Sequence, residues 1–322
     1  MTGIFSSVTD PAVNLATEEY LLKNRTEDIF YLYVNDPSII VGKHQNTLAE
    51  IDYNFIRKNN IPVYRRLSGG GTVYHDHGNL NFCFITNEEK GNLVNFGKYT
   101  RPVVEALEKL GLKITVGERH DLSINGEKIT GTASHVFRNR AMHHGTLLFS
   151  ADLTVLNKCL KAGYQQFKSK GVRSVRSKVT NISDHLRKPM TMTEFQEYIF
   201  NSLAEYYKDT VRHKLTNEEM KIIGYLVKEK YSNWEWNYGY SPKYEFTRKV
   251  SIKGARVTSE VTVEKGIISD IGFSSDNKKL YDALNELARK LTGIQHEKSM
   301  VTGVSENLLP DIPKEDILSL LF

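Results

Sequence analysis

The order of hydrophobic and polar positions predicts alternating helices and strands along most of the chain. Asp10-Pro11 suits the start of a helix that runs to about Lys23, because Asp favours the N-cap and Pro favours the first helical position. Apolar runs at 29–34 and 38–42 predict two strands. Asn35-Asp36-Pro37 between them is typical of a turn.

The same reasoning extends to the rest of the chain. Leu15, Glu18, Glu19 and Leu22 would share one face of the first helix. In the predicted strand 72–86, Leu80, Phe82 and Phe84 alternate with Asn81, Cys83 and Ile85, and we interpret Cys83 as a core residue. Further helices are predicted at 51–59, 102–110, 153–161, 278–291 and 314–320. Two more helices would begin at the capping boxes Thr193–Gln196 and Thr216–Glu219. Further strands are predicted at 142–150, 244–250, 255–264 and 267–273.

A domain boundary is predicted after an aromatic, turn-rich segment, Trp234–Pro242. Residues 1–245 would form one large domain with a mixed sheet flanked by helices. Residues 246–322 would form a small α+β accessory domain, because three strands are followed by helices. The fold class is therefore α+β.

Composition narrows the class of protein. The 322 residues are 25% charged with a net charge of +5, which fits an anionic substrate, an acidic protein partner or an ordinary solvated surface, and no Lys/Arg tract indicates nucleic acid. Cys83 and Cys159 are too few for a disulfide framework, so we expect a cytoplasmic protein. The N-terminal residues do not resemble a secretory signal, and no apolar run approaches a membrane span of roughly 18 residues.

The stretch most informative about chemistry is Arg65-Arg66-Leu67-Ser68-Gly69-Gly70-Gly71. Glycines allow the backbone to approach a ligand, and the two adjacent cations favour a bound phosphate or carboxylate. A plain hairpin turn between 63–67 and 72–75 is the alternative. The stretch is not a P-loop, and it lacks the third glycine of the dinucleotide fingerprint, because Tyr74 stands there.

A second candidate is Lys128. Asn125-Gly126 between alternating segments predicts a tight hairpin, which places Lys128 on the returning strand. Small residues follow, and Gly131 would let a ligand lie close to this strand. Lys128 either points into a pocket or faces solvent.

Two polar loops and a group of histidines complete the candidates. Loop 43–46 could reach a ligand or be a solvated turn, and the basic segment 165–178 could be disordered surface or a lid over an anion. His75, His77, His143 and His144 match no zinc motif, whereas a magnesium ion held by substrate phosphate would leave little trace in the sequence.

Together these features suit a site that activates a carboxylate with ATP. Attack of a carboxylate on a phosphate brings two anions together, so the site needs cations to offset their repulsion. No Ser-His-Asp or Cys-His pairing is evident that would indicate a covalent enzyme intermediate.

Four motifs in a fixed order connect the chain to a known family. They are Asn35-Asp36-Pro37 leading to Val41–Asn46, Arg65–Asp76 with Gly78-Asn79, Lys128–Ala133 and His144–Leu148. With these motifs the whole chain resembles the lipoate–protein ligase A family. The resemblance implies a catalytic domain like that of biotin–protein ligases and a small C-terminal domain that moves during the cycle.

The resemblance also implies roles for particular residues. Lys128 would be the catalytic cation that bridges the lipoate carboxylate and the α-phosphate, and Asp121 would orient Lys128 or lie beside the adenine. Segment 165–178 would be the loop that covers the adenylate. Lipoate or the adenylate would be bound by Arg66, Ser68, Gly69, Gly70, Gly71, Asn79, Lys128, Gly131, Thr132 and His144, and ATP by Thr72, Val73, Tyr74, His75, Asp121, Lys128 and Lys178.

The implied reaction has two steps. Lipoate and MgATP give lipoyl-AMP and pyrophosphate, and a lysine of a lipoyl-domain protein then takes the lipoyl group. Implied acceptors are the E2 subunits of 2-oxoacid dehydrogenases and the glycine cleavage H protein, and we expect a monomer without nucleic-acid or membrane partners. The alternative is a transferase that uses preformed lipoyl-AMP or an acyl carrier without ATP.

Overall fold

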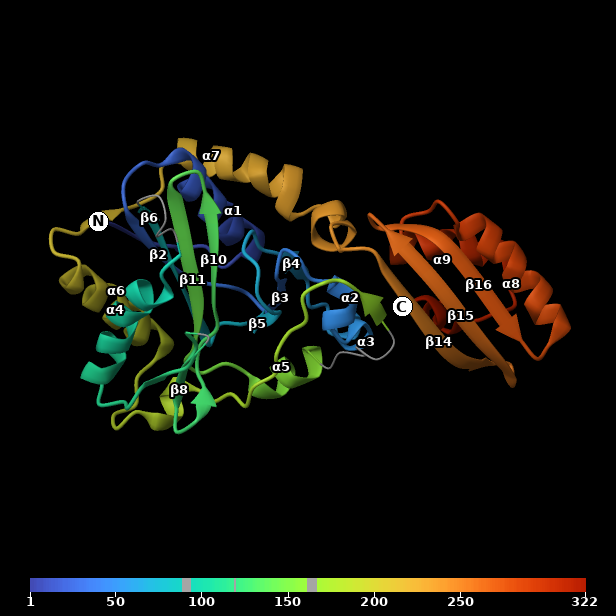
Figure 1. Ribbon diagram of the computed structural model, residues 1–322, viewed down its shortest axis with the longest axis horizontal. Coiled ribbons are helices and arrows are strands. Elements are labelled where there is room, and N and C mark those ends of the chain that lie inside the picture. Colours follow the sequence, from blue (N-terminus) through green and yellow to red (C-terminus); the bar gives the residue numbers. More distant parts are fainter. Residues whose placement is uncertain (89–93, 119, 161–166) are drawn as a thin grey trace. The chain divides into compact units, whose positions relative to one another are not determined.

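The computed structural model describes residues 1–88, 94–118, 120–160 and 167–322 (Figure 1). The chain forms two compact units. Unit 1 comprises Met1–Lys43, Asn59–Leu160 and Ser174–Asn233, and unit 2 comprises His44–Lys58, Lys161–Arg173 and Trp234–Phe322. The boundary expected after residue 245 stays a prediction.

Unit 1 is built on a six-stranded mixed sheet with the order β10-β11-β6-β2-β1-β13. β1 lies parallel to β2 and β13, and the other neighbours are antiparallel. Helices flank this sheet, which confirms the predicted fold class (Figure 1). The strands are β1 (Thr2–Phe5), β2 (Ile29–Val34), β6 (Asn79–Asn87), β10 (Thr132–Phe137), β11 (Arg140–Leu148) and β13 (Val211–His213).

The alternation along the central strands gives the sheet two different faces. Phe30, Leu32 and the equivalent positions of β6 pack into the main hydrophobic core with helices α4 and α6. Tyr31 and Tyr33 point the other way, because their hydroxyls reach side chains of α1. The alternation predicted for residues 80–85 is confirmed, and Cys83 is fully buried, as expected.

The helices of unit 1 begin and end close to the predicted positions, with two exceptions. α4 begins at Phe96 instead of Pro102, because the Asn95 side chain accepts the Lys98 N–H and caps an earlier turn. The capping box before α6 uses Thr191 and Glu194, two residues before the predicted one. The helices are α1 (Pro11–Asn24), α4 (Phe96–Lys109), α5 (Leu153–Cys159), α6 (Met192–Tyr206) and α7 (Asn217–Leu226).

Two three-stranded sheets carry the candidate motifs of unit 1. β3 (Ser38–Val41) lies between β4 (Val63–Arg65) and β5 (Val73–His75), and the glycine run connects the outer two. The predicted strand 72–86 is therefore two strands, separated by the turn at 76–78, where Gly78 N–H donates to the Asp76 side chain.

The second small sheet confirms the hairpin predicted at Asn125-Gly126. Both residues have positive φ values, 52° and 82°, which is what a two-residue turn of this kind requires. The sheet consists of β7 (Thr115–Val116), β8 (Leu122–Ile124) and β9 (Glu127–Lys128) in that order.

Unit 2 combines a four-stranded antiparallel sheet with helices. β12 (Phe167–Ser169) pairs with β14 (Tyr244–Ile252), and β15 (Ala255–Glu264) and β16 (Ile267–Ser275) follow. The three consecutive strands confirm the prediction, whereas β12 was not expected in the basic segment. The helices are α2 (Thr47–Glu50), α3 (Tyr53–Lys58), α8 (Lys278–Leu291), α9 (Lys298–Leu308) and α10 (Lys314–Leu321).

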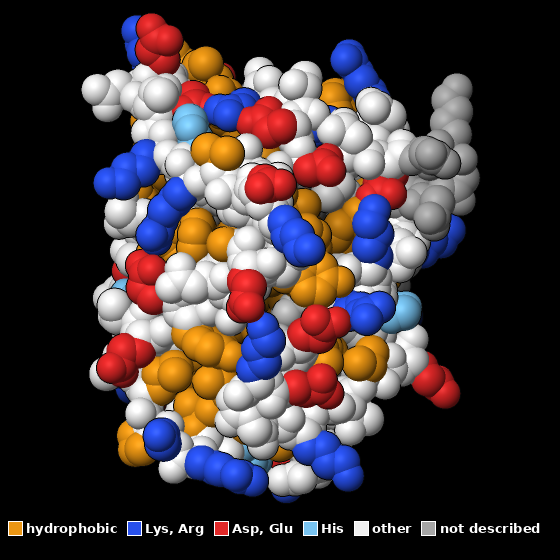
Figure 2. Space-filling model, turned by 90° about the vertical axis from the view of Figure 1, so that its left-hand side faces the viewer, with side chains coloured by type: hydrophobic (Ala, Val, Ile, Leu, Met, Phe, Trp, Pro, Cys, Tyr) orange, Lys and Arg blue, Asp and Glu red, His pale blue; other side chains and the backbone are white. Residues whose placement is uncertain are grey.

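The described surface is mixed in character. Figure 2 shows Lys and Arg side chains interspersed with Asp and Glu on one face, with hydrophobic side chains between them. No helix in the described part of the chain is both long and apolar enough to span a membrane.

Candidate active site

The glycine run forms a loop that lies very close to the end of β3. A Cβ atom at Gly42 would lie 2.2 Å from the carbonyl oxygen of Gly70, so position 42 requires glycine. Gly70 itself has a φ of 85°, in the region that favours glycine. By contrast, nothing lies within 4 Å of a Cβ built at Gly69. The loop therefore has one tightly held flank and one open position.

Both arginines before the glycines donate to backbone carbonyls of this region. Arg65 is fully buried and donates to the carbonyls of Gly42 and Lys43, each at 3.0 Å. Arg66 donates to the carbonyls of Gly69 and Gly71 at 2.6 and 2.7 Å. Burial lowers the pKa of Arg66 to about 10, so it remains a cation at neutral pH. In this structure Arg66 braces the glycine loop and Arg65 braces the segment that follows β3, and anion binding by Arg66 stays a prediction.

A chain of hydrogen bonds joins this loop to α1. Ser68 Oγ accepts from Arg66 Nε at 3.0 Å and lies 2.6 Å from His144 Nε2. His144 Nδ1 lies 2.9 Å from the carboxylate of Glu18, which also accepts from the Tyr33 hydroxyl at 3.0 Å. All five side chains are buried. Because a carboxylate only accepts, His144 carries its proton on Nδ1.

This connectivity is that of a Ser–His–acid triad, which was not evident from the sequence. Ser68 has no exposed surface, and its oxygen already accepts a hydrogen bond from a cation. Both features disfavour Ser68 as a nucleophile. We interpret the chain as a support for the loop and for His144.

Strand alternation explains which histidine joins this chain. His144 is paired with Cys83 and points to the face that α1 covers. His143 is paired with Phe84 and stacks on Tyr99 of α4 at 4.4 Å, on the opposite face. Sequence reasoning noted His144 but missed Glu18. A carboxylate on the same helical face as Leu15 and Leu22 was the available signal.

His75 lies next to this network and is 3% exposed. Its Nδ1 is 3.0 Å from the Asn35 amide nitrogen. Burial, then the charges of Arg66 and His144, lower the pKa of His75 to about 3, so the ring is neutral at physiological pH. His75 Nε2 and Asn79 Oδ1 are both buried and have no hydrogen-bond partner among the described residues.

Lys128 is held by its backbone and has a free side chain. Its N–H donates to the carbonyl of Lys178 at 2.9 Å, and its carbonyl accepts from Thr180 at 3.1 Å. Lys128 is half-buried, and within the described part of the chain no hydrogen bond or ion pair holds its ammonium group. It therefore has donors available for a ligand.

The neighbouring predicted residues are brought to the same region to different extents. A Cβ on Gly70 would lie 3.6 Å from the Cβ of Ala133, and Ala133 pairs with His144, so the glycine loop meets the start of β10. A Cβ on Gly131 would meet nothing within 4 Å. Thr132 Oγ1 donates to the carbonyl of His120 at 3.4 Å.

Asp121 and Lys178 have other arrangements in this structure. Asp121 makes no ion pair with Lys128 among the described residues, and its carbonyl accepts from Gly117 at 2.8 Å. Lys178 is paired with Glu127, which lowers the pKa of that carboxyl. The ATP contacts expected of Asp121 and Lys178 stay predictions.

Part of the basic segment lies against the glycine loop. The Thr72 N–H donates to Ser174 Oγ at 2.8 Å, and a Cβ on Gly71 would lie 3.0 Å from the same oxygen. Residues 165 and 166 of the predicted lid lie outside the described residues. The covering role expected of segment 165–178 stays a prediction.

Two kinds of chemistry find little support here. Cys83 is fully buried, and burial, followed by the effect of Glu18, raises the pKa of its thiol well above the usual value. A thiolate nucleophile is therefore disfavoured. The described residues also contain no group of three His, Cys, Asp or Glu side chains that could hold a metal ion.

Comparison with known proteins identifies the family. Residues 10–204 match the lipoyl protein ligase A/B catalytic domain, and residues 241–321 match the bacterial lipoate protein ligase C-terminus. A lipoate-protein ligase of Bacillus subtilis is 38% identical, with 98% of each chain covered. Lipoate–protein ligase 1 of Staphylococcus aureus is also 38% identical, again with 98% of each chain covered. The chain therefore belongs to the lipoate–protein ligase A family.

Solved structures agree with this assignment. A bipartite lipoate protein ligase of Thermoplasma acidophilum, studied with its E2 lipoyl domain, has a TM-score of 0.65 and 26% identity, covering 74% of this chain and 96% of that one. A lipoate-protein ligase A bound with ATP has a TM-score of 0.62 and 25% identity, covering 74% of this chain and 100% of that one.

Proposed function

We propose that this protein is a lipoate–protein ligase that activates free lipoate with ATP and then transfers the lipoyl group to a protein lysine. Family membership over both matched regions supports the ligase assignment. The observation that carries the mechanism is the ammonium group of Lys128, which no hydrogen bond or ion pair from the described residues holds, on a strand paired with residues 178–180. A cation without an internal partner is what two approaching anions require.

In the first step, a lipoate carboxylate oxygen attacks the α-phosphorus of MgATP. The bond to the bridging oxygen breaks, and pyrophosphate leaves. Lys128 would offset the charge of the carboxylate and of the α-phosphate as they approach. The arginine-braced glycine loop would line the adenylate, with Ser68 and His144 held beside it. The magnesium ion belongs to the substrate.

In the second step, the ε-amine of an acceptor lysine attacks the acyl carbon. The carbon–oxygen bond of the mixed anhydride breaks, AMP leaves, and the nitrogen loses a proton to give the amide. Lipoyl-AMP reacts with water, so the segment around Ser174, which lies on the glycine loop, would protect it until the acceptor docks.

The acceptors we propose are lipoyl-domain proteins, namely E2 subunits and the glycine cleavage H protein. The relative studied with its E2 lipoyl domain supports this class of partner. We further propose a cytoplasmic monomer. The two buried free cysteines are compatible with a reducing compartment.

The decisive measurement is pyrophosphate release from purified protein, ATP, magnesium and lipoate without an acceptor. We expect a lipoate-dependent burst of about one pyrophosphate per chain, because the adenylate is retained. Absence of a burst, together with transfer from added lipoyl-AMP, would instead establish the ATP-independent transferase.

The role of Lys128 is tested by Lys128→Ala. We expect adenylate formation to fall by a factor of about 100 or more, because the central cation is lost, while the unfolding midpoint stays unchanged. Lys279→Ala, at an exposed position of α8, is the matched control and should retain full activity. Near-normal adenylate yield in Lys128→Ala would exclude this role.

A further inference from the structure

The buried imidazole of His75 has one nitrogen that the described protein does not use. Its Nδ1 faces the Asn35 amide, whereas Nε2 is buried without a partner. Buried polar groups are nearly always paired, so a buried nitrogen without a partner calls for an explanation. Which of the two nitrogens carries the proton decides what Nε2 can bind.

The neighbouring side chains decide this question. Asn14 Nδ2 donates to the carbonyls of Val8 and Val34, at 2.9 and 3.2 Å, and Asn14 Oδ1 accepts from the Tyr31 hydroxyl at 2.6 Å. Two backbone carbonyls can only accept, so the amide orientation of Asn14 is fixed.

The fixed orientation of Asn14 also determines the orientation of Asn35 and the proton position of His75. Asn14 Nδ2 also lies 2.9 Å from Asn35 Oδ1, which must therefore be the acceptor oxygen. The Asn35 amide nitrogen then faces His75 Nδ1 as a donor, so Nδ1 must be unprotonated. His75 is neutral, and its single proton lies on Nε2. His144 has the opposite arrangement, with its proton on Nδ1 toward Glu18.

We propose that Asn35 is a positioning residue that holds His75 as a neutral Nε2–H donor for an oxygen of the bound nucleotide. The identity of the ligand rests on the proposed function, whereas the position of the proton does not. The location supports a ligand role, because His75 lies on β5, the strand that directly follows the glycine loop, and its Nε2 is buried without a partner among the described residues. Asn14 and Asn35 would thus determine which nitrogen of His75 carries the proton.

The direct test is the two-bond nitrogen–proton correlation spectrum of the imidazoles in the full-length protein at neutral pH. We expect His75 to be protonated on Nε2 in the wild type, with His75→Phe used for assignment. A proton on Nδ1 would overturn the inference, and this result needs no variant of Asn35.

Asn35→Asp tests the cause. The new carboxylate can only accept, so it should draw a proton onto Nδ1 of His75 and change its spectrum from the Nε2–H form. Asn201→Asp, at an exposed position of α6, adds the same charge elsewhere and should leave the spectrum unchanged. An unchanged His75 signal in folded Asn35→Asp would refute the role of Asn35.

Activity tests the ligand contact. Asn35→Asp and His75→Phe should each lower adenylate formation by a factor of about 100, the lower end of the usual effect of one lost donor, and the double variant should be no worse than either alone. Normal rates in both single variants would refute the donor role. If the wild type forms no adenylate, the proposed function fails, but the His75 contact can still be tested by adding ATP. A shift of the His75 Nε2–H signal then supports the contact, and no shift overturns it.

Discussion

At the scale of single residues, the glycine loop can pack against the end of β3 only because Gly42 has no side chain. Gly42 and Gly70 approach so closely that a methyl group on Gly42 would overlap a backbone carbonyl, which cannot move aside like a flexible side chain. Gly69, in the same loop, has open space around it and no left-handed φ. Gly69, Gly70 and Gly71, which look equivalent in the sequence, therefore have different neighbours.

This difference predicts unequal effects of alanine. Gly42→Ala should lower the free energy of unfolding by about 2 to 3 kcal/mol, because the overlap forces the loop away from β3. Gly69→Ala should change it by less than about 1 kcal/mol. Chemical denaturation of both variants measures the effect, and equal costs would show that the loop is not held at Gly42.

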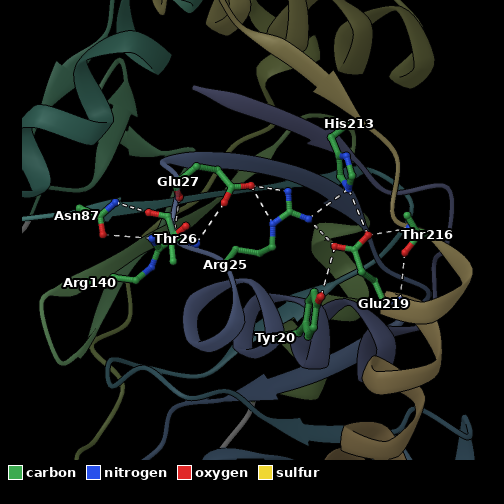
Figure 3. Close-up of polar contacts among 9 residues, drawn as sticks. All are labelled: Tyr20, Arg25, Thr26, Glu27, Asn87, Arg140, His213, Thr216 and Glu219. Atoms are coloured by element: carbon green, nitrogen blue, oxygen red, sulfur yellow. Dashed lines mark hydrogen bonds and ion pairs between the residues drawn. The ribbon is translucent and has the colours of Figure 1, made fainter.

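At the scale of elements, the start of α7 is fixed by one carboxylate. Glu219 completes the capping box with Thr216 and also pairs with Arg25, at the end of α1, and with His213 (Figure 3). Burial of the carboxyl opposes its ionisation, but the hydrogen bonds from Thr216, His213 and Arg25 outweigh it and lower the pKa of Glu219 to about 2. A group with a lowered folded-state pKa stabilises the protein above its unfolded-state pKa.

The stability difference between Glu219→Gln and the wild type should therefore depend on pH. At pH 7 the variant should lose about 2 to 3 kcal/mol, and this loss should shrink as pH falls from about 4.5 towards 2, where the wild-type carboxyl also takes up a proton. Denaturation at several pH values measures it. Glu218→Gln, an exposed neighbour, is the control, and a loss that stays constant with pH would contradict the assignment.

At the scale of the whole molecule, the chain enters unit 2 three times. β12 is paired with β14, and Thr47 of α2 donates its hydroxyl to the carbonyl of Asn237 at 2.8 Å. The segments 44–58 and 167–173 thus have their partners in residues that follow position 233. They cannot keep this packing without the C-terminal sheet.

Deletion of residues 234–322 should consequently expose these two segments to protease. We expect trypsin to cleave after Arg57, Lys58, Lys168 and Lys170 several-fold faster in the truncated chain, because local opening costs less free energy once the partners are gone. Cleavage after Lys98 and Lys109 of α4, a helix that packs into the core of unit 1, serves as the internal control. Equal rates at the four sites would contradict the discontinuous unit.

Much of the fold could be predicted from local signals. The Asn125-Gly126 hairpin, the Thr216–Glu219 box and the three consecutive strands of unit 2 each follow from short-range rules, and all are confirmed. The start of α4 was misplaced, because the preference of Pro102 for a first turn was outweighed by the Asn95 cap. β12 and β13 are three residues long and form only by pairing with distant strands.

The candidate site was predicted in its parts but not in its connections. The glycine loop, Lys128 and His144 stood out by residue type, whereas Glu18 and Asn35 act through contacts across the sheet. Anion binding by Arg66 stays a prediction, whereas the carbonyl contacts of both arginines were not foreseen, because charge alone does not reveal which carbonyls a guanidinium will reach. Such pairings depend on tertiary packing, which spacing along the chain does not encode.

The discontinuous course of unit 2 also sets an order of events during translation. When a ribosome has made the strands and helices of unit 1, segments 44–58 and 167–173 already exist, but β14, β15 and β16 do not. The nascent chain must carry these two segments without their later partners until Trp234–Phe322, roughly the last quarter of the chain, is made. Synthesis therefore finishes unit 1 first, and the final residues then supply the partners with which these two segments complete unit 2.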